Sequence, residues 1–367
     1  MWVVPKKATS LENRSGVSFV GGESVSRLKR LDLRPHVTPS IEFAIVEILW
    51  LWTFGAALEA LLTRDARANR LKLRDSGTRT DKEAREPFEF YPTAYREFRE
   101  LGFARARTLL SKKGGRCLIA TFDLASYYDE IDPSFLVSRP FVDKVAARSA
   151  KRGIDFNIDE FVAATRTLID AFSRYRDDCR SITGVRLTRG IPIGCLTSKD
   201  IANVALSSLD EHVLAQPGVE YYGRYVDDIL LVARPHSMRR LTASAMAARF
   251  LPLNTRDSLR QPELRLDSAK LERDRCRFRL QQSKLKGYVL TGQRGRDLLD
   301  TIERDVRLIA SERRAFLHPD GLGSGSPISA FVLGSDSKAP IQVLRDVDKL
   351  KVERYAASVA ISKVAVG

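Results

Sequence analysis

The sequence is poor in the residues that build zinc sites and disulfide frameworks. It contains only four cysteines and four histidines. The cysteines stand far apart in the chain, and neither a CxxC pair nor a histidine at ligand spacing accompanies them. This pattern argues against a zinc-bound or disulfide-stapled fold and favours a reducing compartment, so we expect a cytoplasmic protein.

Long apolar runs are lacking too. The most hydrophobic stretch, Ile48–Leu58, lies between Glu47 and Glu59, and is shorter than the roughly 20 residues that a membrane helix needs. We therefore expect a buried helix there and no membrane contact. Acidic residues are outnumbered, since 61 Lys and Arg oppose 46 Asp and Glu, for a net charge of +15. Such a surface attracts polyanions, usually nucleic acid, although a merely soluble cationic protein is the alternative.

The order of apolar and turn-forming segments predicts an α+β fold, with helices packed on one face of a sheet. Residues 1–40 are rich in turn formers and predict an irregular arm. The segment Arg64–Arg85 predicts a solvated helix or loop, and Thr93–Arg116 interleaves basic and aromatic residues, as a strand-contacting surface or a solvated helix does. Strands are expected at Cys117–Phe122, Tyr221–Tyr225, Ile229–Ala233 and within Leu271–Leu290, and helices at Ser40–Leu62, Phe161–Tyr175, Ile201–Leu214, Arg240–Phe250, Asp297–Phe316 and Ile341–Val364.

Three aspartates lie where the predicted strands end. Asp123 follows one apolar strand, and Asp227 and Asp228 occupy a tight turn between two others. A lone aspartate in a turn more often caps backbone N–H groups, but adjacent carboxylates at buried strand ends make ionisation costly. A divalent cation removes that cost, and carboxylate oxygens are ligands that Mg²⁺ prefers. The three residues therefore predict a site for two Mg²⁺ ions.

Five segments in order resemble the motifs of the reverse-transcriptase family. Tyr225–Asp228 (YVDD) resembles the family's Tyr-x-Asp-Asp turn, and Phe122–Ile131 (FDLASYYDEI) resembles its first catalytic motif. The other three are similar to its substrate loop, its lysine motif and its Leu-Gly-Tyr turn: Gly190–Asn203 (GIPIGCLTSKDIAN), Leu264–Glu272 (LRLDSAKLE) and Leu285–Leu290 (LKGYVL). The resemblance implies a right-hand polymerase with an antiparallel palm sheet.

The resemblance also implies roles for these residues. Asp123 and Asp227 would bind both metal ions, while Asp228 would support them at the edge of the site. The backbone carbonyl of Leu124 would complete the coordination of one metal. Tyr128 would stack under the incoming sugar and exclude a 2′-hydroxyl, with a plain core aromatic as the alternative.

The remaining motifs imply contacts with substrate. Lys270 would protonate the leaving pyrophosphate, unless it is an ordinary surface lysine. Glycines in the substrate loop permit close backbone approach to the nucleotide or template. The loop residues expected at the substrate are Gly190, Pro192, Ile193 and Gly194, and those expected to grip the primer are Gly287 and Tyr288.

Arginines occupy every second position from Arg273 to Arg279. On a strand they would share one face, with Cys276, Phe278 and Leu280 packed inward on the other. The arginine face would meet phosphates, which arginine binds bidentately, although a solvated edge strand gives the same pattern. The expected nucleic-acid contacts are Arg273, Arg275, Arg277 and Arg279.

The chain departs from the family in the substrate loop, where Ile193 and Cys195 replace the usual Gln and Ser. Because the Gln amide normally touches the incoming nucleotide, we expect a restricted or weakly templated DNA product. We see no RNase H, integrase, maturase or HNH segment. The sequence Phe88–Gly102 and the Gly-Ile-Pro-Ile-Gly form of the loop most resemble bacterial abortive-infection and defence-associated reverse transcriptases.

We therefore expect four regions: an N-terminal arm (1–40), helical fingers (41–116), a palm (117–290) and a C-terminal helical, thumb-like or assembly region (291–367). The expected function is Mg²⁺-dependent, RNA-directed DNA synthesis in antiphage defence. Its partners would be dNTPs, the DNA product, an RNA template such as a dedicated non-coding RNA, and further subunits in a homo- or hetero-oligomer. The alternatives are a retron- or intron-like reverse transcriptase and a catalytically idle nucleic-acid-binding scaffold. A nucleotide cyclase would need a Gly-Gly-acidic turn that is lacking here.

Overall fold

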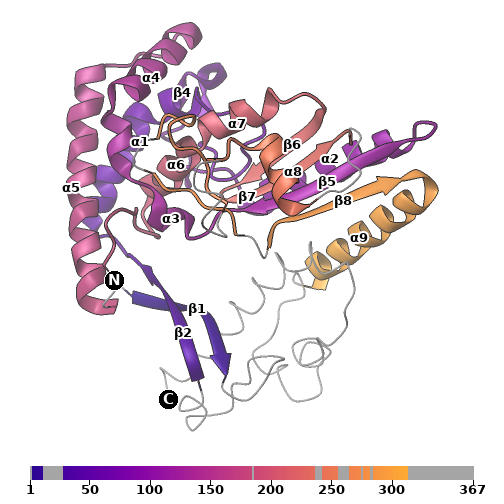
Figure 1. Cartoon of the computed structure of the whole chain (residues 1–367). Helices are drawn as coiled ribbons and strands as arrows, with labels where there is room; N and C mark the ends of the chain where they lie inside the picture. Colours follow the sequence, from indigo (N-terminus) through magenta and orange to yellow (C-terminus); the bar gives the residue numbers. More distant parts are fainter. Residues whose placement is uncertain are drawn as a thin grey trace. The chain divides into compact units, whose positions relative to one another are not determined.

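The chain divides into two compact units, one formed by Val37–Arg296 and the other by Met1–His36 with Asp297–Gly367. The boundaries expected near 40 and 290 lie close to these limits, whereas the predicted fingers and palm belong to a single unit. The computed structural model (Figure 1) describes residues 2–10, 28–183, 186–235, 242–254, 264–273, 276–281 and 284–312.

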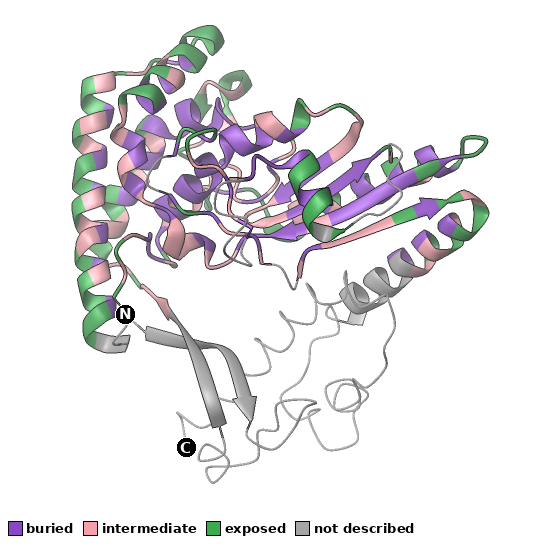
Figure 2. Ribbon diagram, viewed as in Figure 1, coloured by how far each residue is buried: buried purple, intermediate pink, exposed green. Residues whose placement is uncertain are grey.

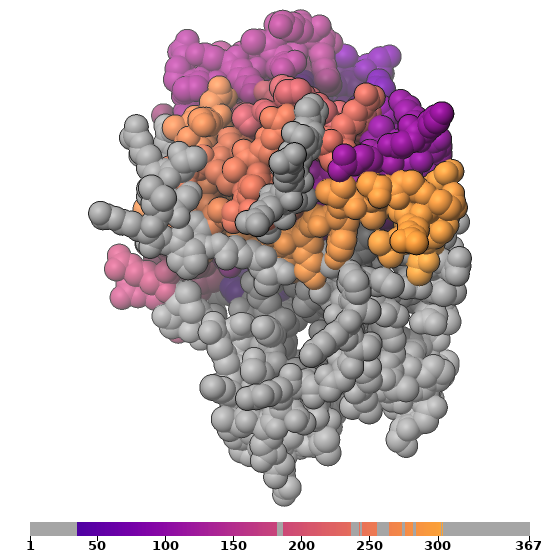
Figure 3. Space-filling view, turned by 45° about the vertical axis from the view of Figure 1, so that its right-hand side comes forward, coloured from indigo at the N-terminus to yellow at the C-terminus, as the bar shows by residue number. Residues whose placement is uncertain are grey.

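An antiparallel four-stranded sheet of order β6-β7-β5-β8 forms the centre of the larger unit (Figure 1). Its strands are β5 (Arg116–Asp123), β6 (Val219–Tyr225), β7 (Asp228–Ala233) and β8 (Lys286–Thr291). Figure 2 shows β5 and β7 mostly buried, as their continuous apolar sequences require. In Figure 3 the orange residues of the β8 region lie at the surface beside the purple residues that lead into β5. This arrangement is consistent with the pairing of Thr291 with Arg116.

Helices pack on both faces of this sheet, so the prediction of helices on one face is wrong. Thr121 pairs with Leu230 and Ala120 with Gly287, and because neighbours along a strand point to opposite sides, Leu230 and Gly287 lie on opposite faces. Helix α2 approaches Leu230 at Gly102, and α8 approaches Gly287 at its methionine, Met246. The helices of this unit are α1 (Ile41–Glu59), α2 (Tyr91–Leu110), α3 (Tyr127–Glu130), α4 (Arg139–Arg152), α5 (Ile158–Thr183), α6 (Leu196–Ala205), α7 (Ser207–Leu214) and α8 (Ala243–Phe250).

Helix α1 is longer than the apolar run that predicted it. Ser40 caps it by accepting a hydrogen bond from the backbone N–H of Phe43. Its length and composition would suffice to cross a membrane, and 44% of its most apolar window is buried within the protein. Its glutamates are bonded to other segments: Glu47 accepts from the backbone and hydroxyl of Thr197, and Glu59 from the backbone of Leu71. These bonds tie α1 to α6 and to the segment that follows α1.

The segment Arg64–Arg85 is irregular and rich in turns, as the loop alternative of the prediction has it. Its second half is mostly exposed, but its first part is packed, with Ala66, Ala68 and Leu71 buried. Ala66 forms a parallel bridge with Arg224 of β6, supported by 2.8 Å hydrogen bonds from Arg67 N to Arg224 O and from Arg224 N to Asp65 O. The segment therefore extends the edge of the sheet through its backbone, which side-chain polarity does not reveal. It also contains the short strands β3 (Leu73–Arg74) and β4 (Arg79–Thr80), with the 3₁₀ helix η2 (Asp75–Gly77) between them.

The smaller unit differs from the expected irregular arm. Strands β1 (Trp2–Ser10) and β2 (Leu28–His36) pair antiparallel in a two-stranded sheet. Helix α9 (Gly292–Glu312) begins in the larger unit and covers most of the helix predicted from Asp297. The helix predicted at 341–364 lies outside the described residues.

All four cysteines are described, buried and unpaired with one another: Cys117, Cys179, Cys195 and Cys276. Burial raises the pKa of Cys117 and of Cys276 to about 11, and that of Cys195 to about 12. The thiols therefore stay protonated at neutral pH, and they act as small apolar core residues.

A buried acid in α6 predicts how stability depends on pH. Asp200 is fully buried, and neither carboxyl oxygen has a hydrogen-bond partner among the described residues. Burial, with the nearby charge of Glu59, raises the pKa of Asp200 well above its usual range, against the opposing effect of Arg70. The folded protein thus keeps a proton that the unfolded chain loses near pH 4.

We therefore expect the free energy of unfolding to fall as pH rises above about 4, by up to about 1.4 kcal/mol per pH unit for this one proton. Asp200→Asn cannot ionise, so its stability advantage over the wild type should grow with pH across this window. Urea denaturation at several pH values measures it. Asp177→Asn, which changes an exposed acid of α5, is the control. A constant difference between Asp200→Asn and the wild type would show that Asp200 is ionised in the folded protein.

Candidate active site

The sheet brings two of the predicted aspartates directly together. Asp123 at the end of β5 lies opposite Asp228 at the start of β7, and such cross-strand partners point to the same face. Their carboxyl groups are hydrogen-bonded to each other. Burial, together with the charges of Asp227 and Asp123, raises the pKa of Asp228 well above its usual range. Asp228 therefore holds its proton to a higher pH than an ordinary aspartate does.

The third aspartate, Asp227, lies in the turn that connects β6 to β7. Tyr225 pairs with Asp228, which leaves Val226 and Asp227 as a two-residue hairpin loop. Val226 has a φ of 58°, in the left-handed region that β-branched residues rarely adopt. Such a conformation costs of order 1–3 kcal/mol and persists only where the surroundings enforce it, often at functional sites.

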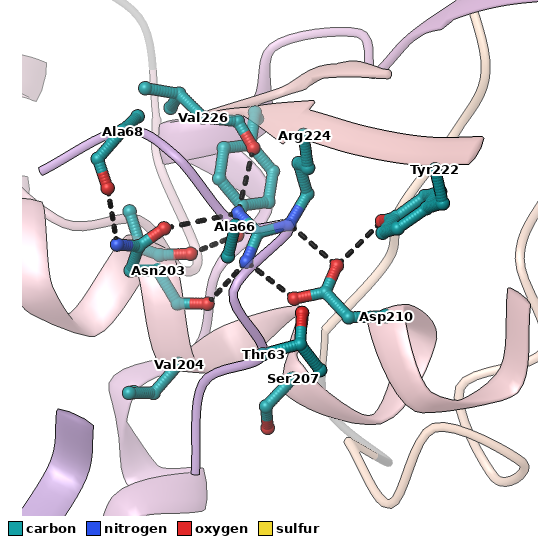
Figure 4. A network of polar contacts seen from close by, with 12 residues as sticks. Thr63, Ala66, Ala68, Asn203, Val204, Ser207, Asp210, Tyr222, Arg224 and Val226 are labelled. Carbon is teal, nitrogen blue, oxygen red and sulfur yellow. Dashed lines mark hydrogen bonds and ion pairs between the residues drawn. The ribbon is translucent and has the colours of Figure 1, made fainter. Parts of the chain in front are cut away.

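The buried side chain of Arg224 enforces this turn (Figure 4). Its Nη1 donates to the carbonyl oxygen of Val226 at 3.0 Å. The same guanidinium binds Asp210 of α7 bidentately, Nε to Oδ1 at 2.7 Å and Nη2 to Oδ2 at 2.8 Å. Both side chains have no exposed surface. Paired arginine forks of this kind fix geometry as well as charge, so the turn is anchored to the helical layer beneath the sheet.

Asn203 extends this network to the segment after α1. Its side-chain oxygen accepts from Arg224 Nη1 at 3.2 Å, and its Nδ2 donates to the carbonyl of Ala68 (Figure 4). Tyr222 donates its hydroxyl to Asp210 at 2.5 Å. Every polar group of the network thus has a partner, which low-dielectric interiors require. Sequence reasoning had placed Asn203 in the substrate loop motif, and had missed Arg224 and Asp210.

A lysine that the sequence analysis did not single out stands at the carboxylates. Lys284 Nζ lies 2.8 Å from Asp123 Oδ2. By contrast, Lys270 of the lysine motif is 61% exposed and pairs with Asp267 at 3.8 Å. The sequence feature that could have identified Lys284 is its position immediately before the segment LKGYVL. The strand in that segment pairs with the strand that ends in Asp123.

The substrate loop is held against the first motif and against the start of the larger unit. Gly190 N donates to Ile131 O, and Ile191 N donates to Tyr128 O. Gly194 has a φ of 116°, and a Cβ there would collide with the carbonyl of Val37, whose N–H donates to Ile193 O at 2.8 Å. Glycine at 194 is therefore required by both conformation and space. Pro192 is buried within the same loop, and Ile193 is partly exposed.

The two tyrosines of the first motif differ in role. Tyr127 is fully buried, and its hydroxyl donates to the carbonyl of Ala202. Tyr128 is only partly buried and contacts Tyr127 edge-on, with ring centroids 6.0 Å apart. Of the pair, Tyr128 is therefore the one available to a substrate.

If Tyr128 excludes the 2′-hydroxyl of the incoming nucleotide, Tyr128→Ala should admit ribonucleotides without abolishing synthesis. We expect the preference for dNTPs over rNTPs to fall by a factor of about 10 or more, as for other single steric contacts. Competition between labelled dNTPs and rNTPs measures the ratio, with Tyr128→Phe as the matched control that keeps the ring. An unchanged ratio in Tyr128→Ala would leave Tyr128 as a packing residue.

The predicted arginine face is formed only in part, because Arg277 and Arg279 alternate with buried residues but Arg273 does not face outward. Arg273 is fully buried, with its guanidinium 4.4 Å and 5.0 Å from the ring centroids of Phe135 and Phe141. It therefore does not present its charge to phosphates. Arg277 is exposed, and Arg279 pairs with Glu130 at 2.7 Å. Cys276, Phe278 and Leu280 are buried as expected, and Arg275 lies outside the described residues.

The remaining predicted site residues lie in the sheet or directly after β5. Leu124 is buried, and its N–H donates to Asp227 O at 3.3 Å. Tyr288 pairs with Ile119, which places it on the same face as Asp123, whereas Gly287 pairs with Ala120 and lies on the other. The two residues expected to grip the primer are thus divided between the two faces of the sheet.

Aromatic rings lead from the turn between β6 and β7 to the surface at the start of α2. Tyr225, opposite Asp228, contacts Tyr95 edge-on at 4.8 Å between centroids. Burial raises the pKa of Tyr225 to about 12, and the nearby hydroxyl of Tyr91 adds to this. Phe90 and Tyr91 are 63% and 70% exposed, with ring centroids 5.9 Å apart. Exposed rings of this kind offer faces on which planar groups can stack.

The carboxylates fit a metal that binds together with its substrate. Among the described residues, no three His, Cys, Asp or Glu side chains are gathered closely enough to hold a metal ion unaided. Mg²⁺, however, usually takes one or two carboxylates and completes its shell with substrate phosphates and water. The paired Asp123 and Asp228, with a cationic ammonium already against Asp123, are a donor set of this kind. Comparison of the sequence with protein-family models gives no match, and comparison with curated proteins gives none.

Proposed function

We propose that the protein is a Mg²⁺-dependent, RNA-directed DNA polymerase of the right-hand type. The observation that carries this proposal is the strained hairpin between β6 and β7, at which Asp228 lies opposite Asp123. Arg224 holds this hairpin by donating a hydrogen bond to the carbonyl oxygen of Val226. A structural aspartate pair would need neither a strained turn nor a dedicated buried arginine. The order of motifs along the chain adds to this support.

In this proposal Asp123 and Asp227 bind the metal ions and Asp228 supports them at the edge of the site, as the resemblance implies. When bound, two Mg²⁺ ions would activate the primer 3′-hydroxyl and stabilise the leaving pyrophosphate. Tyr128 limits the space at the sugar, and the loop from Gly190 to Gly194 forms the adjoining wall, since its backbone is bonded to Tyr128 and Ile131.

A nucleic-acid substrate accords with the surface beside the turn. Phe90 and Tyr91 offer stacking faces, and single-stranded nucleic acid gains about 1–3 kcal/mol for each base stacked on an aromatic ring. The guanidinium of Arg99 lies 4.7 Å from the ring of Tyr95 in the same region. The excess of positive charge over the whole chain would contribute the sequence-independent part of binding.

The direct test is incubation of the purified full-length protein with Mg²⁺, all four dNTPs and primed RNAs of several sequences, followed by sequencing of the DNA. DNA synthesis that EDTA abolishes is expected. RNA binding without incorporation would instead support the idle scaffold. Repetitive DNA that ignores the supplied template would support the restricted product proposed from Ile193, whereas faithful copies of every template would contradict it.

We propose a role in antiphage defence on the resemblance alone. Its test is the survival of phage-infected bacteria that carry the wild-type gene or the gene with Asp228→Asn. Protection by both would separate defence from polymerisation.

A further inference from the structure

Lys284 forms an ion pair with Asp123, and the backbone around the lysine explains why it lies there. Gln281 N donates to Asp123 O at 2.8 Å, and Lys284 N donates to Gln281 O at 2.9 Å. Two residues later Lys286 pairs with Thr121 at the start of β8. The backbone of Lys284 is thus fixed beside the strand that ends in Asp123.

From this fixed backbone position the side chain of Lys284 reaches Asp123, the carboxylate that we expect to bind metal. Nζ lies 2.8 Å from Asp123 Oδ2, and the two side chains are 26% and 8% exposed. An ammonium and a Mg²⁺ ion cannot both occupy the same lone-pair direction of Oδ2. Their charges would also repel each other strongly in a site with little water.

We propose that Lys284 is a resident counter-cation that divalent metal displaces from Asp123, and that its freed ammonium then contacts the phosphates of the incoming nucleotide. The first part of this inference rests on the proposed metal site at Asp123, and the second part on the proposed polymerase activity. The flexible four-carbon stem of lysine permits the exchange, since the ammonium can leave Oδ2 while the anchored backbone keeps it near the site. Lys270 lacks this geometry because its partner is Asp267.

The first test measures metal binding without substrate. Mn²⁺, used as the probe, is titrated into the full-length protein and followed by electron paramagnetic resonance. Lys284→Gln is expected to bind Mn²⁺ about tenfold more tightly, because one competing charge has been removed. Lys284→Arg keeps the charge and should resemble the wild type. Lys113→Gln removes an exposed charge of the loop after α2 and controls for net charge.

Unchanged or weaker Mn²⁺ binding in a folded Lys284→Gln protein, with its fold checked by circular dichroism, would overturn the counter-cation role. The second test is kinetic: Lys284→Gln should raise the KM for dNTPs about tenfold, with recovery in Lys284→Arg. Tighter Mn²⁺ binding with an unaltered KM would refute the phosphate contact. Tighter binding in a protein that never incorporates dNTPs would refute the proposed function and leave the counter-cation role intact.

Discussion

Asp228→Asn is expected to reduce DNA synthesis by on the order of 10³-fold or more, because it removes a charge that the transition state needs at the metal site. Asp227→Asn is expected to do the same. Asparagine keeps the shape of aspartate, so the fold and the aromatic surface should survive. The measurement is incorporation of labelled dNTPs at saturating Mg²⁺, with RNA binding by fluorescence anisotropy as the control.

Stability separates this expectation from simple damage to the fold. The pKa of Asp228 is raised in the folded protein, so ionising it at neutral or higher pH costs stability. Asp228→Asn should therefore be more stable than the wild type, increasingly so as pH rises above the ordinary range of an aspartate. An inactive but stabilised variant is the pattern expected of a functional residue. Incorporation near the wild-type rate would refute the catalytic assignment.

The same raised pKa affects metal binding. Because a metal ligand must lose its proton, Mg²⁺ binding should release a proton from the carboxylate pair and become tighter as pH increases. At limiting Mg²⁺ the activity should therefore rise with pH, and at saturating Mg²⁺ this dependence should weaken.

Arg224→Met is expected to lower the free energy of unfolding by about 3–5 kcal/mol, because it leaves Asp210 charged and buried without its partner. The variant also loses the anchor of the Val226 carbonyl. Urea denaturation followed by circular dichroism measures the change. Arg139→Met, which breaks an exposed ion pair with Asp143 in α4, should change the same quantity by less than about 1 kcal/mol.

The double variant Arg224→Met/Asp210→Leu tests the cause. Replacing both partners by apolar residues removes the uncompensated charge, so the loss should be smaller than the sum of the two single losses. Additive losses would show that the two side chains contribute independently. Activity in the double variant should remain low, because nothing then holds the strained turn.

The apolar strands and the hairpin were predictable because their patterns are local. Tyr221–Tyr225 is rich in tyrosine and Ile229–Ala233 is a continuous apolar run, the two flank a tight turn, and β6 and β7 follow them closely. The N-cap at Ser40 was likewise visible in the sequence. Local chemistry decides such elements, and tertiary contacts only reinforce them.

Other features depend on contacts between distant segments, which a sequence pattern does not reveal. The spacing of the arginines predicted that Arg273 faces solvent, but its guanidinium packs against the rings of Phe135 and Phe141. Arg224 gave no signal beside the YVDD turn, because its partner, Asp210, lies on a helix before the strand. Lys284 was missed for the same reason, since the strand pairing that brings it to Asp123 links parts of the chain far apart in sequence.

The burial of every cysteine has a practical consequence for following this protein at work. Thiol-directed dyes and spin labels react with exposed thiolates. Cys117, Cys179, Cys195 and Cys276 are buried, so a label cannot reach them, and burial also keeps their thiols protonated. A single cysteine introduced at an exposed position would then be the one rapidly labelled thiol in the native wild-type background. Fluorescence or distance measurements of the turn and of the α2 surface would thus need no prior removal of the natural cysteines, whose replacement would disturb the core.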